Sequence, residues 1–300
     1  MRIQYLNGGL ANQVFQYIFA RYAELSNPGT EPWLLDDSFF YVNNVHNGYE
    51  LEKVFGIRAN LLSKNFDEEV WDEFIKNKKN GISVPQSFKN LGFNIFMIAE
   101  FDNYESHNPF DGTIYHVPGN TFIPDITRAE CEIAYYHGYW LDDQWFNTYR
   151  DALLPEFTFP DIEDPLNTMY AYQILTTDSV AVHVRRGDYV TIGWASQNSY
   201  YVDAARQILN VHPDAVFFIF SDDIEWCKNN RSELGFDLPK EVVYVEGNGS
   251  AQSYRDLQLM SLCKGMILSK SAFCYLALLL SPTNEYYVKD NIYKVIVYCL

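Results

Sequence analysis

The sequence predicts an α/β protein of two Rossmann-like domains, each built on a parallel sheet. The chain has 300 residues, which is more than one compact core usually fills. Its second half alternates apolar runs with segments of helical spacing, which is typical of a parallel sheet with right-handed crossovers. Its first half opens with a strand, a glycine turn and a helix. We expect domains over residues 1–155 and 166–300, with the ligand-binding edges of the two sheets facing each other across a cleft.

The first domain is expected to begin with a strand over residues 2–6, where apolar and polar residues alternate. A tight turn follows at Asn7-Gly8-Gly9. Asn12 is a good helix cap, and the apolar residues after it recur with helical spacing until Asn27-Pro28-Gly29. The signal then weakens, and we expect strands over residues 33–35 and 95–99 and helices over residues 67–78 and 128–134.

Prolines at positions 155, 160 and 165 mark residues 155–166 as a linker or an extended crossover. Strands and helices alternate regularly after it. We expect strands over residues 179–184, 215–220, 242–245, 266–268 and 286–288. We expect helices over residues 200–209, 253–263 and 272–280, and a further helix that follows residue 223 and ends at about residue 229.

The charge balance limits the classes of partner. The net charge is −17, from 39 acidic and 22 basic residues. Nucleic-acid binding and polybasic contact with anionic lipid both need a basic face, so neither is expected. An acidic protein that binds an anion must concentrate positive charge locally, which makes the adjacent Arg185 and Arg186 informative.

Cysteine usage and hydropathy indicate a cytoplasmic protein. The five cysteines are odd in number and widely spaced, with no CxxC pair, so we expect a reducing compartment and no zinc site. The segment before the glycines at positions 8 and 9 is too short and too polar for a signal peptide. Because the longest apolar run, residues 272–280, is half of what a bilayer needs, we expect no transmembrane segment and at most peripheral membrane contact.

The most informative motif is His183-Val184-Arg185-Arg186-Gly187-Asp188-Tyr189, at the end of a predicted strand. Ligands of open parallel sheets bind at this end. His183 and Arg185 share one face of the strand and are expected to point toward the crevice. A diphosphate needs bidentate donors that stay charged, which arginine supplies, and Asp188 would orient one guanidinium. The alternatives are a structural arginine–aspartate pair and, for His183, a buried hydrogen-bonded histidine.

Two further strand ends carry polar residues. A carboxylate of Ser221-Asp222-Asp223 would accept from both donors of guanine, or it would simply cap the next helix. Ser269-Lys270-Ser271-Ala272 opens a helix, whose free amides bind phosphate, although an ordinary cap explains it equally well.

These motifs and their order resemble glycosyltransferase family 11, the α-1,2-fucosyltransferases that use GDP-fucose, over nearly the whole chain. The shared pieces are Gly8-Gly9-Leu10-Ala11-Asn12-Gln13-Val14-Phe15-Gln16-Tyr17, Gly138-Tyr139-Trp140, the arginine motif, Phe220-Ser221-Asp222-Asp223 with Trp226, and Asp256-Leu257-Gln258-Leu259-Met260-Ser261 followed by Ser271 and Phe273.

The resemblance implies a two-domain GT-B-type fold and an inverting reaction with no metal and no cofactor. It implies a GDP-fucose donor and a galactose-terminated oligosaccharide acceptor. Because no anchor segment is expected, we also expect a bacterial enzyme that decorates surface polysaccharide on the cytosolic side, with at most peripheral contact with the inner membrane. Arg185 would hold the β-phosphate, Asp223 would read guanine, and Tyr139 and Trp140 would shape the acceptor side. The implied catalytic residues are Arg185, Asn12 and Asp188, and the implied donor-binding residues are Gly9, His183, Arg186, Ser221, Asp223, Lys270, Ser271, Ala272 and Phe273.

Several positions depart from the family pattern. They are Ala11, Gly265, Lys270, Ala272 and Tyr275-Leu276, and all but the first are expected near the donor site. They leave open a different GDP-deoxyhexose, such as colitose, or a catalytically silent carbohydrate-binding protein of the same fold. The general base also stays open among Asp188, Glu100, Asp102 and His137.

Overall fold

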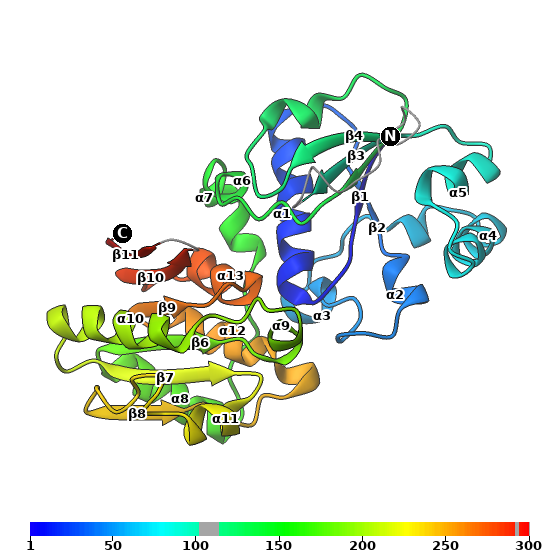
Figure 1. Cartoon of the computed structure of the whole chain (residues 1–300). Helices are drawn as coiled ribbons and strands as arrows, with labels where there is room; N and C mark the ends of the chain where they lie inside the picture. The colour runs from blue at the N-terminus through cyan, green and yellow to red at the C-terminus, as the bar shows by residue number, and fades with distance from the viewer. Residues whose placement is uncertain (102–113, 292–293, 300) are drawn as a thin grey trace. The chain divides into compact units, whose positions relative to one another are not determined.

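The computed structural model describes residues 1–101, 114–291 and 294–299, with side chains for residues 1–100 and 114–290. The chain divides into two compact units, Met1–Thr158 and Phe159–Leu300 (Figure 1). The division falls inside the proline-marked segment 155–166.

The sheet of the first unit has the strand order β2-β1-β5-β3-β4, and every neighbouring pair is parallel. The chain therefore leaves β1 toward β2 on one side, while β5 returns to pair with β1 on the other. This arrangement creates a switch point at the carboxyl ends of β1 and β5, where open α/β sheets bind ligands. The strands are β1 (Arg2–Tyr5), β2 (Leu34–Asp36), β3 (Phe96–Phe101), β4 (Ile114–Pro118) and β5 (Ala134–His137).

Two expectations for the first unit are wrong. Helix α1 begins at Leu10 with Gly9 as its cap, so Asn12 lies inside the first turn and does not cap the helix. No α-helix spans residues 128–134, because a 3₁₀ turn ends at Arg128 and the chain then enters β5 with Ile133 and Tyr135 in the core. The helices are α1 (Leu10–Ser26), α2 (Phe39–Val42), α3 (Leu51–Phe55), α4 (Glu68–Lys79), α5 (Val84–Asn90), α6 (Gln144–Asn147) and α7 (Arg150–Leu153).

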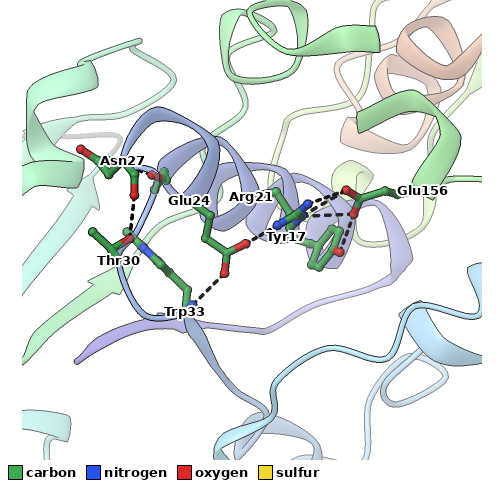
Figure 2. Close-up of polar contacts among 8 residues, drawn as sticks. Tyr17, Arg21, Glu24, Asn27, Thr30, Trp33 and Glu156 are labelled. Carbon is green, nitrogen blue, oxygen red and sulfur yellow. Dashed lines mark hydrogen bonds and ion pairs between the residues drawn. The ribbon is translucent and has the colours of Figure 1, made fainter. Parts of the chain in front are cut away.

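The end of the first unit is fixed to α1 by Glu156, in the short turn η4 (Leu154–Glu156). Its carboxylate accepts a hydrogen bond from the Tyr17 hydroxyl at 2.6 Å and pairs with the Arg21 guanidinium at 2.9 Å (Figure 2). Arg21 also pairs with Glu24 one turn along the helix. Tyr17 and Glu156 are 139 positions apart in the chain, and Arg21 and Glu156 are 135 positions apart. These contacts therefore hold the last turn of the unit against its first helix.

The sheet of the second unit has the order β11-β10-β9-β6-β7-β8. The strands from β10 to β8 are parallel, and β11, which the sequence analysis did not predict, is antiparallel to β10. Because the chain runs outward from β6 to β8 and then returns to β9 beside β6, the switch point lies between β6 and β9. The strands are β6 (Ser179–Val184), β7 (Val216–Ser221), β8 (Glu241–Tyr244), β9 (Gly265–Leu268), β10 (Tyr286–Asn291) and β11 (Lys294–Cys299).

The helices of the second unit follow the strands closely. Val180, Val182 and Val184 of β6 point into one core with Tyr201 and Ala205 of the following helix, as the alternation along the strand predicted. Two helices were not predicted: α8, which Asp164 caps and Pro165 opens, and the short α9 inside the arginine motif. The helices are α8 (Pro165–Thr176), α9 (Gly187–Thr191), α10 (Asn198–Val211), α11 (Ile224–Asn229), α12 (Tyr254–Ser261) and α13 (Ala272–Leu280).

Among the described residues, no helix combines the length and the apolar character that a membrane crossing requires.

Candidate functional site

The polar strand ends of the second unit meet at the switch point between β6 and β9. The arginine motif leaves β6, the Ser221-Asp222-Asp223 segment leaves β7, and the segment 269–271 leaves β9. Since these three strands are neighbours in one parallel sheet, their carboxyl ends lie along the same edge. The sequence motifs of this unit therefore converge in space.

Arg185 is held from two sides. One terminal nitrogen lies 2.8 Å from Asp222 Oδ2, and the other donates to Asp188 Oδ1 at 2.8 Å. The predicted orientation by Asp188 is therefore present, and Asp222 adds a second contact. The side chains of Asp222 and Asp188 are 26% and 64% exposed, so Asp222 is the more enclosed partner.

Arg186 is fixed by stacking. Its Cζ lies 3.3 Å from the centre of the Trp226 ring, and its Nε lies 3.5 Å from Asp223 Oδ2. The Arg186 amide donates to Asp222 Oδ1 at 2.8 Å. A guanidinium on the face of an indole is held by cation–π attraction, so the second arginine of the motif is anchored to α11.

Gly187 permits the approach of Asp222 to the arginine loop. A Cβ at this position would lie 2.7 Å from Asp222 Oδ2, which is closer than real Cβ contacts allow. The residue also has a φ of +21°, at the border of the left-handed region that favours glycine. The glycine of the motif therefore leaves room for the Asp222 carboxylate in its observed position beside the loop after β6.

The local charge is not the positive patch that the sequence analysis expected. Arg185 and Arg186 are accompanied by three carboxylates, from Asp188, Asp222 and Asp223. The guanidiniums are therefore paired before any ligand arrives. Asp222 was not among the predicted site residues; its position beside Asp223 at a strand end was the available signal.

His183 is buried and forms a hydrogen bond across the switch point. Its Nδ1 lies 2.7 Å from the hydroxyl of Ser269, which follows β9. Burial, with a smaller effect from Arg185, lowers the pKa of His183 to about 3, so the imidazole is neutral near neutral pH. The structure thus shows the buried, hydrogen-bonded histidine that was one of the two interpretations, and the centre of its ring lies 5.8 Å from that of the Phe273 ring.

The amino end of α13 lies on the same edge. Ser271 caps the helix, and its hydroxyl accepts from the Phe273 amide at 3.2 Å. Ala272 is the first helical residue, and Lys270 Nζ lies 3.8 Å from Asp290 Oδ2 on β10. The predicted phosphate-binding residues 270–273 are therefore together at one helix end, with the charge of Lys270 shared with an aspartate.

The two residues predicted from the loop after β7 have structural contacts. The Ser221 hydroxyl donates to the Val184 carbonyl at 2.7 Å, which ties β7 to β6. Asp223 caps α11, since its Oδ1 accepts from the Trp226 amide at 3.2 Å. The capping interpretation is therefore observed, while the Asp223 side chain stays 47% exposed and accessible to a ligand.

A hollow of about 560 Å³ lies beside Arg186. It runs along the segment 193–199 to the amino end of α10, and Val190 of α9 completes its wall. This helix end has no side-chain cap, and its first residues, Asn198 and Ser199, line the hollow. The hollow is wide enough for one small ligand next to the arginine loop.

In the first unit, the predicted Gly9 and Asn12 lie at the start of α1, after β1. Gly9 is the helix cap, and a Cβ on Gly8, whose φ is +76°, would lie 2.5 Å from Asn12 Nδ2. The Asn12 amide therefore packs directly over the glycine turn. Of the two aromatics expected on the acceptor side, Tyr139 is 41% exposed, whereas Trp140 is buried, stacks on Phe19, and so belongs to the core.

The four candidates for the general base have different environments. Glu100 accepts from the amides of Asn120, Tyr139 and Trp140, so its carboxylate organises the loop after β5. Asp188 is exposed and paired with Arg185. His137 is partly buried, and Asp102 lies outside the described residues. The choice of base stays a prediction.

Comparison with known proteins decides the family. The sequence profile described as Glycosyl transferase family 11 matches residues 5–294. The chain belongs to glycosyl transferase family 11. The family that the motifs resembled is thereby confirmed.

Two bacterial relatives match most of the chain. An α-1,2-colitosyltransferase from Escherichia coli is 29% identical over 276 residues, covering 90% of this chain and 84% of that protein. The O-antigen biosynthesis glycosyltransferase WbnK from the same organism is 28% identical, covering 90% and 87%. A galactoside 2-α-L-fucosyltransferase SEC1 from Bos taurus is 24% identical, covering 63% of this chain and 50% of its own length.

A solved structure supports the fold. The fucosyltransferase NodZ from Bradyrhizobium matches with a TM-score of 0.54 and 11% identity, covering 99% of this chain and 98% of that chain. The α/β architecture with two mostly parallel sheets is therefore shared with a solved glycosyltransferase.

The structure corrects the position of one departure from the family pattern. Gly265 is the first residue of β9, at the strand end opposite Lys270, and so it is not near the donor site. A Cβ there would lie 2.2 Å from the Tyr286 ring, which itself stacks on His212. Glycine at this position makes room for an aromatic pair.

No metal centre is apparent in the part of the chain with described side chains, where no three His, Cys, Asp or Glu residues are grouped to hold an ion. Metal independence stays a prediction.

Proposed function

We propose that this family 11 protein transfers a deoxyhexose, L-fucose first, from a GDP-linked donor to the 2-hydroxyl of a galactoside. The reaction would form an α-1,2 linkage with inversion and without a metal ion. The observation that carries the proposal is that Arg185, Arg186 and the amino end of α13 follow the carboxyl ends of the neighbouring parallel strands β6 and β9, and so lie along one edge of the second sheet. Two guanidiniums and a helix amino end together suit a diphosphate.

In this proposal Arg185 stabilises the charge that builds on the departing diphosphate. A preorganised cation of this kind contributes roughly 3–4 kcal/mol to transition-state stabilisation. Asp223 would accept from guanine through its exposed edge, and Ser271 and the α13 amides would hold phosphate. Asn12 would act from the first unit. The proposal therefore includes a GT-B-type arrangement, in which the two units face each other across a cleft.

A second donor, GDP-colitose, is favoured by one specific observation. The colitosyltransferase of Escherichia coli is similar to this chain over 90% of its length. Colitose lacks one hydroxyl of fucose. A site that hydrogen-bonds this hydroxyl would strongly prefer GDP-fucose to GDP-colitose, whereas a site without the contact would discriminate little between the two donors.

The deciding experiment supplies each candidate donor separately to the purified protein together with a panel of β-galactosides. The donors are GDP-fucose and GDP-colitose, with GDP-mannose and UDP-galactose for comparison. The linkage of any product is determined by NMR. We expect an α-1,2-linked deoxyhexosyl product and no transfer from UDP-galactose. Binding of GDP without sugar transfer in any mixture would instead favour the catalytically silent interpretation.

The role of Arg185 is tested by Arg185→Ala. We expect the transfer rate to fall by about two orders of magnitude or more, as for the removal of other preorganised donors. Arg206→Ala is the matched control, because Arg206 forms an exposed ion pair with Asp203 on α10. An Arg185→Ala enzyme that turns over like wild type would remove this residue from the mechanism.

A further inference from the structure

The carboxyl edge of the first sheet carries ionisable side chains that the donor site does not use. Tyr5, Asp36 and His137 are the last residues of β1, β2 and β5, three neighbouring parallel strands. Lys78 reaches them from α4, and Tyr135 of β5 adjoins them. We call these five residues the Lys78 cluster. It lies at the switch point of the first sheet, where ligands of such sheets bind.

The inner half of the cluster is structural. The Asp36 carboxylate is fully buried and accepts from the Tyr135 hydroxyl at 2.6 Å and the Ser38 amide at 2.9 Å. Lys78 Nζ lies 3.8 Å from the same carboxylate and donates to the Ser38 hydroxyl at 2.6 Å. A buried carboxylate needs such partners, so these contacts explain how Asp36 and Lys78 are accommodated.

The outer half of the cluster has capacity that the fold does not use. Lys78 Nζ lies 4.3 Å from the centre of the Tyr5 ring, and the His137 ring meets Tyr5 edge-on at 4.9 Å. All three side chains are partly exposed. Within the described part of the chain, neither imidazole nitrogen of His137 has a hydrogen-bond partner. The outer half therefore presents an ammonium, an imidazole and an aromatic ring to a ligand.

The charge state of His137 suits a neutral, hydroxyl-bearing ligand. Burial, followed by the nearby Lys78 charge, lowers the pKa of His137 to about 4, and Asp36 only partly opposes this. The imidazole is therefore neutral near neutral pH and keeps one nitrogen as an acceptor. Lys78 supplies donors close by, so a donor and an acceptor lie together.

We propose that Tyr5, Lys78 and His137 form the subsite that binds the galactoside acceptor. The inference rests on the proposed function, because it assigns the acceptor of that reaction. The His137 imidazole accepts a hydrogen bond from one sugar hydroxyl, and the Lys78 ammonium donates to another. Tyr139, exposed in the loop after β5 and coupled electrostatically to Tyr5, adds an aromatic surface at the rim. His137 is then a positioning residue for the acceptor.

The kinetic test separates acceptor from donor. For His137→Phe we expect the KM for lactose to rise about tenfold, as for loss of a substrate hydrogen bond, while the KM for GDP-fucose stays unchanged. His137→Gln keeps an acceptor oxygen and should restore most of the lost affinity. An unchanged lactose KM in a folded His137→Phe enzyme would overturn the proposal.

Two controls separate binding from stability. Tyr135→Phe removes a hydrogen bond to the same Asp36 from a side chain that is fully buried, so it should lower stability and leave the lactose KM unchanged. Lys76→Met alters an exposed lysine on the same helix, paired with Glu73, and should change neither property. A Tyr135→Phe variant with the same lactose KM defect as His137→Phe would reduce the cluster to a structural role.

A binding measurement tests the subsite without turnover. Lactose is titrated into the full chain in the presence of GDP, and the imidazole NMR signals of His137, assigned through their loss in His137→Phe, are followed. We expect saturable shifts of these signals. If these shifts occur in a protein that does not use GDP-fucose, the proposed donor would be contradicted, whereas the proposed acceptor subsite would still be supported. Lactose that leaves the His137 signals unmoved would overturn the subsite even in an active fucosyltransferase.

Discussion

At the scale of single residues, the loop after β6 depends on contacts between neighbours in space more than on the arginines alone. Asp222 bonds the guanidinium of Arg185 and the backbone of Arg186 at the same time. This carboxylate therefore fixes the direction of one side chain and the path of the loop. A Cβ at Gly187 would force this carboxylate to shift from its present position.

Gly187→Ala tests this dependence. The added methyl would displace the Asp222 carboxylate and release Arg185, so we expect the affinity for GDP to fall about tenfold, which is roughly 1.4 kcal/mol. Isothermal titration of GDP measures the change. Gly29→Ala is the control, because its φ of +90° brings backbone strain while nothing lies within 4 Å of the added atom. Equal GDP affinity in Gly187→Ala and wild type would show that GDP binding does not depend on the space that Gly187 leaves for Asp222.

His183 shows what residue-level sequence reasoning could and could not reach. Alternation along β6 correctly separated the valines from His183 and Arg185. The same pattern could not reveal that Ser269, 86 positions later, bonds the imidazole. Partners of this kind depend on strand order, which one strand's sequence does not encode.

At the scale of elements, three segments of the second unit meet through a chain of amides and carboxyls. Asp164, which caps α8, bonds Asn167, and Asn167 exchanges two hydrogen bonds of 2.8 Å with Asn248 in the loop after β8. Asn248 then donates to Asp256 of α12 at 2.8 Å. Burial raises the pKa of Asp256 to about 7, although the Asn248 bond opposes the shift. This network joins α8, which the sequence did not predict, to a motif shared with family 11.

The Asp256 carboxyl should make stability depend on pH. Because its folded pKa of about 7 lies above the unfolded value, the folded state binds more protons between these values, and stability should rise as pH falls from about 7 to about 4. Asp256→Asn keeps an oxygen acceptor for Asn248 and removes the buried charge. We expect this variant to be more stable than wild type at pH 8 by about 1–3 kcal/mol. We also expect its free energy of unfolding to change less than that of wild type between pH 7 and pH 5.

Urea unfolding at several pH values measures this difference. Asp161→Asn is a control in the segment before α8, where the carboxylate has no such burial. An Asp256→Asn profile parallel to wild type would assign the pH dependence to other groups.

The elements also show where sequence patterns succeed. The buried apolar runs of β6, β7 and β9 and the spacing of α10 and α13 gave correct element types within a few residues. The patterns were weak where the element is short. Residues 128–134 looked helical, but Ile133 and Tyr135 alternate into the core, and α9 has only five residues. For the edge strand β11, the sequence offered no indication of a strand other than its apolar residues.

At the scale of the whole molecule, each unit has its own sheet and its own core, and the Glu156 contacts close the first unit upon itself (Figure 2). Glu156→Ala would leave Tyr17 and Arg21 without this partner. We expect the free energy of unfolding of the first unit to fall by about 1–3 kcal/mol, which would lower the midpoint of its thermal transition by about 3–8 °C. Calorimetry measures it, and added GDP identifies the transition of the second unit by raising its midpoint alone.

Glu73→Ala is the matched control for that experiment. Glu73 forms an exposed ion pair with Lys76 in the same unit, and such pairs contribute less than about 1 kcal/mol. A single transition that Glu156→Ala and Glu73→Ala shift equally would contradict the assignment of Glu156 to the closure of the first unit.

The carboxylates around Arg185 have a consequence for turnover. If Arg185 binds a diphosphate as proposed, that ligand would compete with the carboxylates already on the guanidinium, and the exposed Asp188 would be the easier of the two to displace. Asp188 would return to the guanidinium when the spent nucleotide leaves. The proposed site would therefore contain its own competitor for the cation, which would weaken product binding and favour release.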